Sequence, residues 1–241
     1  MPKALRRRFG RLRQVLLQHG WMAAARLAAD RAGKLLMGLE VSQMFWLDRS
    51  SLPAADGPHA DLEFGFLTLE EIEHFQKDPR NSLAPEFVER ARDCHDLCFA
   101  AAADGRLANF AWYALNGIVG GRCAPITLST PTNVAYMYNA FTHPDYRGQR
   151  LHGLATELAM DKLQELGIDS LVMLVDWTNQ PSLRSYRRLG GRPIGRLITV
   201  GWGRCKWTFL PCAACRLGIR FGRHAKVGRV VPCRGEKLLA S

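Results

Sequence analysis

The 241-residue sequence has no apolar run close to the roughly 18 residues that a membrane-spanning helix requires. It also has no long tract of serine, glutamine or proline of the kind that is typical of disordered regions. Hydrophobic residues make up 47% of the chain and charged residues 23%. We therefore expect a globular protein that does not cross a bilayer and that has one principal domain.

The cysteines do not suggest a disulfide framework. There are seven, an odd number in a chain long enough to have its own core, and no signal peptide is evident. These observations favour a reducing, cytoplasmic location. Two residues separate Cys212 from Cys215, and Cys205 and Cys233 lie nearby in sequence, so a four-thiolate zinc site is one interpretation. The spacing is loose, and unpaired thiols with no bound metal are the favoured interpretation.

The formal net charge of +11 indicates attraction to an anionic partner. Residues 1–47 have no acid before Asp30, and their apolar residues recur at helix-like intervals, which predicts a basic amphipathic helical extension. It could lie on an anionic membrane surface, at the inner face of a membrane, or pack on the main domain; nucleic acid is a less favoured partner. Much of the positive charge lies at the two ends, in Arg6, Arg7, Arg8, Arg11, Arg13, Arg216, Arg220, Arg223, Lys226 and Arg229.

Changes in composition divide the chain. After the extension at residues 1–47, a linker rich in Ser, Pro, Gly and Asp occupies residues 48–60, a main domain residues 61–211, and a basic, Cys-containing tail residues 212–241.

Within the main domain, the order of predicted elements indicates an α/β fold with a mixed sheet. Thr68 and Glu71 form the pattern of a capping box, Pro85 suits a first helical position, and Asp104-Gly105 predicts a hairpin turn. Further predicted elements are strands at 134–142 and 170–177, helices at 151–166 and 180–189, and a final strand pair at 192–202 and 204–210.

One turn in this domain has the composition of an anion site. Residues 140–167 run from the end of a strand through a Pro-Asp-Tyr-Arg-Gly turn into an amphipathic helix. A helix N-terminus presents unpaired N–H groups and partial positive charge, so Arg147, Gly148, Gln149 and Arg150 could hold a phosphate or pyrophosphate. An ordinary glycine-containing loop is the alternative on these residues alone.

The segment Thr142-x-Pro144-x-Tyr146-Arg147-Gly148, followed by an amphipathic helix, resembles the acetyl-coenzyme A signature of the GNAT N-acyltransferase superfamily. A second region resembles the family in Asn179, Ser182, Tyr186 and the sequence RLGG at residues 188–191. The resemblance covers residues 61 to about 210 and implies a mixed, mostly antiparallel central sheet flanked by helices. The sequence departs from the family pattern at Arg150 and His152, where glycines are usual. A second register, Arg150-x-x-Gly153-x-Ala155, fits the pattern but moves the turn by three residues.

The resemblance implies transfer of an acetyl or other acyl group from acyl-CoA directly to a primary amine. Backbone groups of Phe141 and Thr142 would bind the thioester end, and Asn179 the pantetheine arm. Tyr186 would protonate the departing thiolate. The pyrophosphate would be held by Arg147, Gly148, Gln149, Arg150, Leu151 and His152.

The general base and the acceptor amine stay open. Tyr138, His143, Glu157 and Asp176 are candidate bases by location, and a chain of water molecules is a further alternative. A small amine, an amino sugar, an amino-acid α-amine and a protein lysine all fit as acceptors. The alternative function is a non-catalytic GNAT-like binding module that uses its basic ends for nucleic acid or a membrane. The replacement of the usual glycines by Arg150 and His152 favours the binding module, whereas the presence of Asn179 and Tyr186 favours the enzyme.

Overall fold

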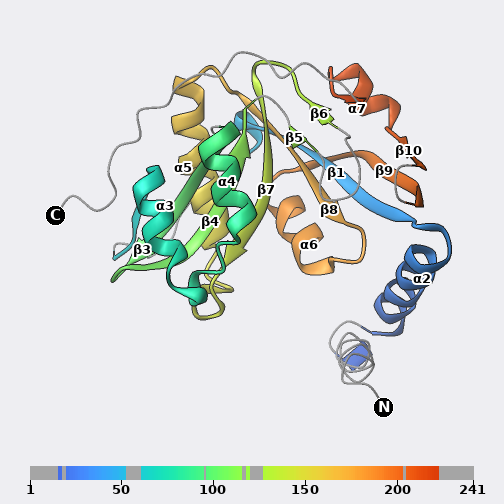
Figure 1. The fold of residues 1–241 in the computed structure, drawn as a ribbon, viewed down its shortest axis with the longest axis horizontal. Coiled ribbons are helices and arrows are strands. Elements are labelled where there is room, and N and C mark those ends of the chain that lie inside the picture. Colours follow the sequence, from blue (N-terminus) through green and yellow to red (C-terminus); the bar gives the residue numbers. More distant parts are fainter. Residues whose placement is uncertain are drawn as a thin grey trace.

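The computed structural model of the protein describes residues 16–17, 20–52, 61–94, 96–115, 118–119, 127–202 and 205–222 (Figure 1). The helices are α2 (Trp21–Met37), α3 (Leu69–Gln76), α4 (Pro85–Cys94), α5 (Leu151–Glu165), α6 (Gln180–Arg188) and α7 (Cys212–Arg216), with short 3-10 helices η1 (Arg49–Ser51), η2 (Pro79–Asn81) and η3 (Pro144–Tyr146). The strands are β1 (Glu40–Asp48), β2 (Glu63–Phe66), β3 (Leu97–Ala103), β4 (Arg106–Ala114), β5 (Ile118–Val119), β6 (Thr127–Ser129), β7 (Val134–Thr142), β8 (Ser170–Asp176), β9 (Arg192–Trp202), β10 (Cys205–Phe209) and β11 (Arg220–Gly222).

An eight-stranded sheet lies at the centre of the fold, with strand order β10-β9-β1-β8-β7-β4-β3-β2. β7 and β8 are parallel, and the other neighbouring pairs in this sheet are antiparallel. Helices α3 and α4 pack on one face around Phe75 and Trp112, and α5 and α6 pack on the other around Met160 and Tyr186. The prediction of a mixed, mostly antiparallel sheet flanked by helices is confirmed.

Local sequence signals account for several element boundaries. The Thr68 side chain accepts a hydrogen bond from the Glu71 N–H, and the Glu71 carboxylate accepts one from the Thr68 N–H, so the predicted capping box starts α3. Pro85 is the first residue of α4. Asp104 and Gly105 both adopt positive φ angles, 50° and 69°, as a tight hairpin turn between β3 and β4 requires.

Strand β1 is the main difference from the predicted organisation. Residues 40–48 were expected mainly within the helical extension, but they form a strand that pairs with β8 on one side and β9 on the other. Met44, Phe45 and Leu47 are completely buried. The boundary predicted at residue 47 therefore falls inside a central strand of the domain, and the helical part of the extension, as far as the structure describes it, ends at Met37.

Helix α2 precedes β1, and an ion pair and a hydrogen bond join it to the end of β8 and the residue that follows. The Lys34 ammonium lies 2.8 Å from the Asp30 carboxylate and 3.2 Å from the Asp176 carboxylate. The indole N–H of Trp177 donates to Asp30 over 2.9 Å, which satisfies a carboxylate that is 6% exposed. Among the helices in the described ranges, none combines the length and hydropathy needed to cross a membrane.

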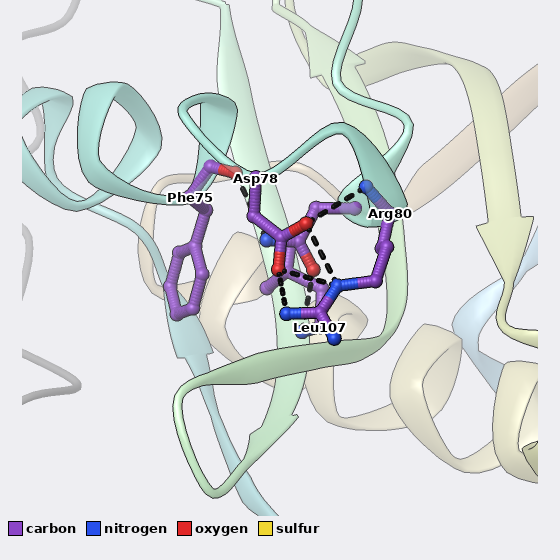
Figure 2. Close-up of polar contacts among 5 residues, drawn as sticks. Phe75, Asp78, Arg80 and Leu107 are labelled. Atoms are coloured by element: carbon purple, nitrogen blue, oxygen red, sulfur yellow. Dashed lines mark hydrogen bonds and ion pairs between the residues drawn. The ribbon is translucent and has the colours of Figure 1, made fainter.

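The turn η2 joins α3 to the start of β4 through one buried side chain (Figure 2). The Asn81 amide donates to the Phe75 carbonyl over 2.9 Å and accepts from the Leu107 N–H over 3.1 Å. On the surface of the same turn, the Arg80 guanidinium forms an ion pair with Asp78 at 2.6 Å. Asn81 therefore satisfies two backbone groups that come from separate elements.

Replacing Asn81 with Ala is expected to destabilise the protein by about 1–3 kcal/mol, because it leaves the buried Leu107 N–H without a partner and removes one of the donors to the Phe75 carbonyl. The measurement is the free energy of unfolding in urea. The matched variant Arg80→Ala removes an exposed ion pair from the same turn and should leave the unfolding midpoint almost unchanged. Equal effects of the two variants would contradict the role assigned to Asn81.

Candidate functional site

The two parallel strands separate at their carboxyl ends. β7 and β8 pair from Val134 opposite Ser170 to Met137 opposite Met173, and no farther. Beyond that point β7 stays with β4 as far as Thr142, whereas β8 stays with β1 as far as Asp176. The opening between them forms part of a cavity of about 1230 Å³, lined by the ends of both strands, the turn before α5, and α6.

The N-terminus of α5 lies at this cavity. Gly148 has φ 82° and Arg150 has φ 60°, so the chain makes a left-handed turn before the helix begins at Leu151. No side chain caps the helix, and the Gly153 and Leu154 N–H groups donate to the Arg150 carbonyl, so the N–H groups of Leu151 and His152 are those left for a ligand. A methyl group placed on Gly148 would meet no atom within 4 Å, so the turn leaves room for a bound group.

The structure fits the first of the two registers of the motif. β7 ends at Thr142, as the Thr-x-Pro pattern predicts, and the turn spans Arg147 to Arg150. Arg150 occupies a position usually held by glycine and has the positive φ that glycine adopts without strain. The arginine thus places a cation at the cavity where a glycine would offer only backbone.

The predicted pyrophosphate residues contribute in different ways. Arg147 and Arg150 both line the cavity, and the Nε of Arg147 donates to the Thr142 carbonyl over 3.0 Å. Gln149 does not line it, because its amide donates to the Asp145 carbonyl over 3.1 Å. The Leu151 side chain is 1% exposed and belongs to the core, so its contribution would come from its backbone N–H.

The strand residues Phe141 and Thr142 both border the cavity. The Phe141 carbonyl accepts a hydrogen bond from the Asn109 amide over 2.8 Å, and the Thr142 carbonyl accepts from Arg147. Both carbonyls are thus already engaged within the protein.

Tyr186 and His152 both line the cavity. Their rings are in an edge-to-face contact, with centroids 5.5 Å apart. Burial raises the pKa of the Tyr186 hydroxyl above its ordinary value, so the phenol keeps its proton at neutral and moderately alkaline pH. Burial also lowers the pKa of His152 to about 4, which keeps the imidazole neutral at pH 7. The Phe45 ring of β1 lies 5.9 Å from the Tyr186 ring, a contact that no local sequence pattern predicts.

Asn179 is at the N-terminus of α6 and lines the cavity. Its side-chain oxygen accepts a hydrogen bond from the Ser182 N–H over 3.3 Å, and the residue is otherwise exposed. The structure therefore brings Asn179 to the same cavity as Tyr186 and Arg147, which are 7 and 32 residues away in sequence.

Tyr138, one of the candidate bases, lines the cavity and also belongs to a polar cluster with Asp96 and Arg90. Its hydroxyl donates to the Asp96 carboxylate over 2.5 Å, and Arg90 holds the same carboxylate at 2.8 Å. Burial and the neighbouring Asp96 carboxylate raise the pKa of Tyr138. A phenol that already donates to a carboxylate is a poor base at neutral pH. Sequence reasoning did not find Arg90 or Asp96, since no motif links them to Tyr138.

The other candidate bases also have structural partners. Two hydrogen bonds from Thr178 and the ion pair with Lys34 outweigh the desolvation of Asp176 and lower its pKa. Glu157 lies 3.7 Å from the Arg49 guanidinium, and His143 lies 3.4 Å from the Asp145 carboxylate. Of these three residues, only Asp176 lines the cavity.

The cysteine motif has no metal-like arrangement in the part of the chain that the structure describes. Cys212 and Cys215 are exposed free thiols on α7. Within the described residues, no group of three or more His, Cys, Asp or Glu side chains is arranged to hold a metal ion. Cys233 and the side chain of Cys205 lie outside that description.

A sheet that opens between two parallel strands, with a helix N-terminus at the opening, is the arrangement that the resemblance to the GNAT acyltransferases implies. The model of the family described as "Acetyltransferase (GNAT) family" matches residues 64–191, more than half of the sequence. The chain belongs to this family.

Two curated relatives extend the similarity. The chain is 27% identical over 150 residues to mycothiol acetyltransferase of Thermobifida fusca, an overlap that covers 62% of this chain and 40% of the relative. It is 26% identical over 145 residues to mycothiol acetyltransferase of Thermomonospora curvata, covering 60% of this chain and 39% of the relative. The matched part thus spans about 40% of the length of these relatives.

Solved structures are more distant. A GCN5-related N-acetyltransferase from Kribbella flavida aligns with a TM-score of 0.47 and 16% identity, over 73% of this chain and 62% of the other. The ribosomal-protein-S18-alanine N-acetyltransferase from Escherichia coli aligns with a TM-score of 0.39 and 20% identity, over 54% of this chain and 76% of the other.

Proposed function

We propose that the protein is an acyl-CoA-dependent N-acyltransferase that moves an acetyl or other acyl group directly to a primary amine. The observation that carries the proposal is the cavity at the divergence of β7 and β8, with the N-terminus of α5, Arg147 and Arg150 at its wall. Family membership supports acyl transfer in general, and the acceptor amine is left unassigned.

The residues at the cavity suit acyl-CoA. The N–H groups at the start of α5 and the guanidinium groups of Arg147 and Arg150 would bind the pyrophosphate, since both kinds of donor favour a doubly charged anion. The side chain of Asn179 would hydrogen-bond to the pantetheine arm across the opening. When bound, acyl-CoA supplies an activated thioester carbonyl.

Tyr186 is the proposed general acid. Its raised pKa keeps the hydroxyl protonated, and the thiolate that leaves from CoA is the group in need of a proton. The amine nitrogen forms a bond to the acyl carbon, the carbon–sulfur bond breaks, and the hydroxyl proton passes to sulfur. The proton that the amine loses would leave through water, because Tyr138 and Asp176 are engaged by their own partners.

Two measurements test the proposal. Titration calorimetry should show binding of acetyl-CoA, and an assay of free thiol should show its release when an amine acceptor from a panel is added. Absence of binding would contradict both the site and the activity. Binding without thiol release over the whole amine panel would favour the non-catalytic binding module.

Arg147→Glu is expected to weaken acetyl-CoA binding by roughly 10- to 100-fold, because it replaces a cation at the pyrophosphate position with an anion. Calorimetry gives the change in Kd directly. Lys77→Glu makes the same charge reversal at an exposed residue that does not line the cavity, and should leave Kd almost unchanged. An unaltered Kd in the Arg147 variant would show that the pyrophosphate binds elsewhere.

A further inference from the structure

The outer face of α2 is exposed and apolar. The buried residues of the helix, Ala24, Leu27, Asp30 and Gly33, form its inner face. On the outside, Trp21, Leu35 and Leu36 are 72%, 66% and 76% exposed, and Met22 and Met37 are also exposed. Figure 1 shows α2 at the edge of the molecule, away from the helices that cover the sheet.

Eight of the exposed residues form one continuous stripe. At 100° per residue, they span an arc of roughly 140° that contains no polar side chain, and Met37 lies outside it. Arg26 follows one border of this arc and Arg31 the other. An apolar arc with basic residues at its borders is the pattern of helices that lie in a membrane interface. The members of the arc are Trp21, Met22, Ala25, Ala28, Ala29, Ala32, Leu35 and Leu36.

The charge of the surrounding sequence selects the partner. The first 29 residues contain seven lysines and arginines and no aspartate or glutamate. Such a segment is attracted to anionic lipid headgroups. A second copy of the chain is disfavoured on this face, because pairing two α2 helices would bring two strongly basic segments together. An anionic bilayer thus matches both the apolar stripe and the charge beside it.

We propose that α2 binds an anionic lipid bilayer, with this stripe at the boundary between headgroups and acyl chains. The proposal does not depend on the acyltransfer reaction. It has a consequence for the site, because Lys34 pairs with Asp176 and Trp177 donates to Asp30. Asn179 follows this contact by two residues, so the helix that would lie on the lipid is bonded to the segment that carries a residue of the cavity wall.

Vesicle co-sedimentation of the full chain tests the proposal. The protein is expected to sediment with phosphatidylcholine vesicles that contain phosphatidylglycerol, and to do so weakly with pure phosphatidylcholine. Added salt should reduce binding, since it screens the attraction between basic residues and headgroups. Failure to bind the phosphatidylglycerol vesicles overturns the proposal, whatever the outcome of the acetyl-CoA measurements.

The double variant Leu35→Gln, Leu36→Gln distinguishes the contribution of the apolar stripe to binding from that of the charge. It removes two apolar side chains and keeps the net charge. Its partition onto the anionic vesicles is expected to fall by roughly tenfold or more. Leu69→Gln, at an exposed leucine of α3, is the matched control and should bind like the unaltered protein. Undiminished binding of the double variant overturns the proposal. So does a dimer in sedimentation velocity that the double variant abolishes, because a second copy would then cover the stripe.

Discussion

Removal of residues 1–48 is expected to leave a chain that no longer unfolds cooperatively. The deletion takes away β1, which lies between β8 and β9 and carries three completely buried side chains, Met44, Phe45 and Leu47. Loss of large core side chains costs about 2–5 kcal/mol each, and two strand ladders are lost with them. The total is comparable with the about 5–15 kcal/mol that stabilises a typical domain. Calorimetric and urea unfolding of the purified chains provide the measurement.

The informative comparison is removal of residues 1–39, which deletes α2 but keeps β1. This shorter deletion should retain a cooperative transition at reduced stability, because it removes the contacts of Lys34 and Asp30 with the loop after β8 and leaves the sheet intact. Cooperative unfolding of both chains would contradict the role of β1. Loss of cooperativity in both would mean that α2 is also required for folding.

Tyr186→Phe is expected to lower kcat by roughly 100- to 10,000-fold, the usual contribution of a positioned proton donor. The ring and its contacts with His152 and Phe45 are kept, so acetyl-CoA should bind with nearly unchanged affinity. Tyr113→Phe is the control, since it makes the same change at a buried tyrosine that does not line the cavity. Similar kcat values in the two variants would contradict the role of Tyr186 as the general acid.

The dependence of the unaltered protein's rate on pH gives a second readout for Tyr186. Burial raises the pKa of the phenol, so the acid form is present below that pKa and is lost only well above the ordinary value of about 10. The rate should therefore rise as the acceptor amine loses its proton and should show no decline up to about pH 9 from ionisation of this hydroxyl. A decline near neutral pH would indicate a different proton donor.

Local sequence patterns predicted much of the fold and of the site. The strand at 134–142 has the bounds of β7, and α5 begins at Leu151 as its apolar periodicity indicates. Turn composition and helix periodicity depend on neighbours a few residues away, so they can be read without the fold. The cavity then brings together Arg147, Asn179 and Tyr186, whose shared location was inferred from the family resemblance.

What the sequence could not show depends on contacts between distant segments. Residues 40–48 follow a basic helical segment, and nothing local indicates that β8 and β9 will lie on either side of them. The same is true of Asp96, whose bond to Tyr138 joins residues 42 positions apart. Gln149 was placed at the pyrophosphate by its position in the motif, whereas its amide turns to Asp145. The direction of the Gln149 side chain depends on this backbone acceptor, which the motif does not reveal.

The position of β1 also constrains the order in which the protein can fold. Ser42 pairs with Asp176, so closing this ladder joins segments separated by more than half of the chain. Contacts of such sequence separation are slow to form, because the entropy of a long loop is lost before any pairing offsets it. During synthesis, β1 emerges well before β8 and β9 and has to wait with both edges and its apolar side chains unprotected. The central sheet is therefore completed late, by a strand that is made early.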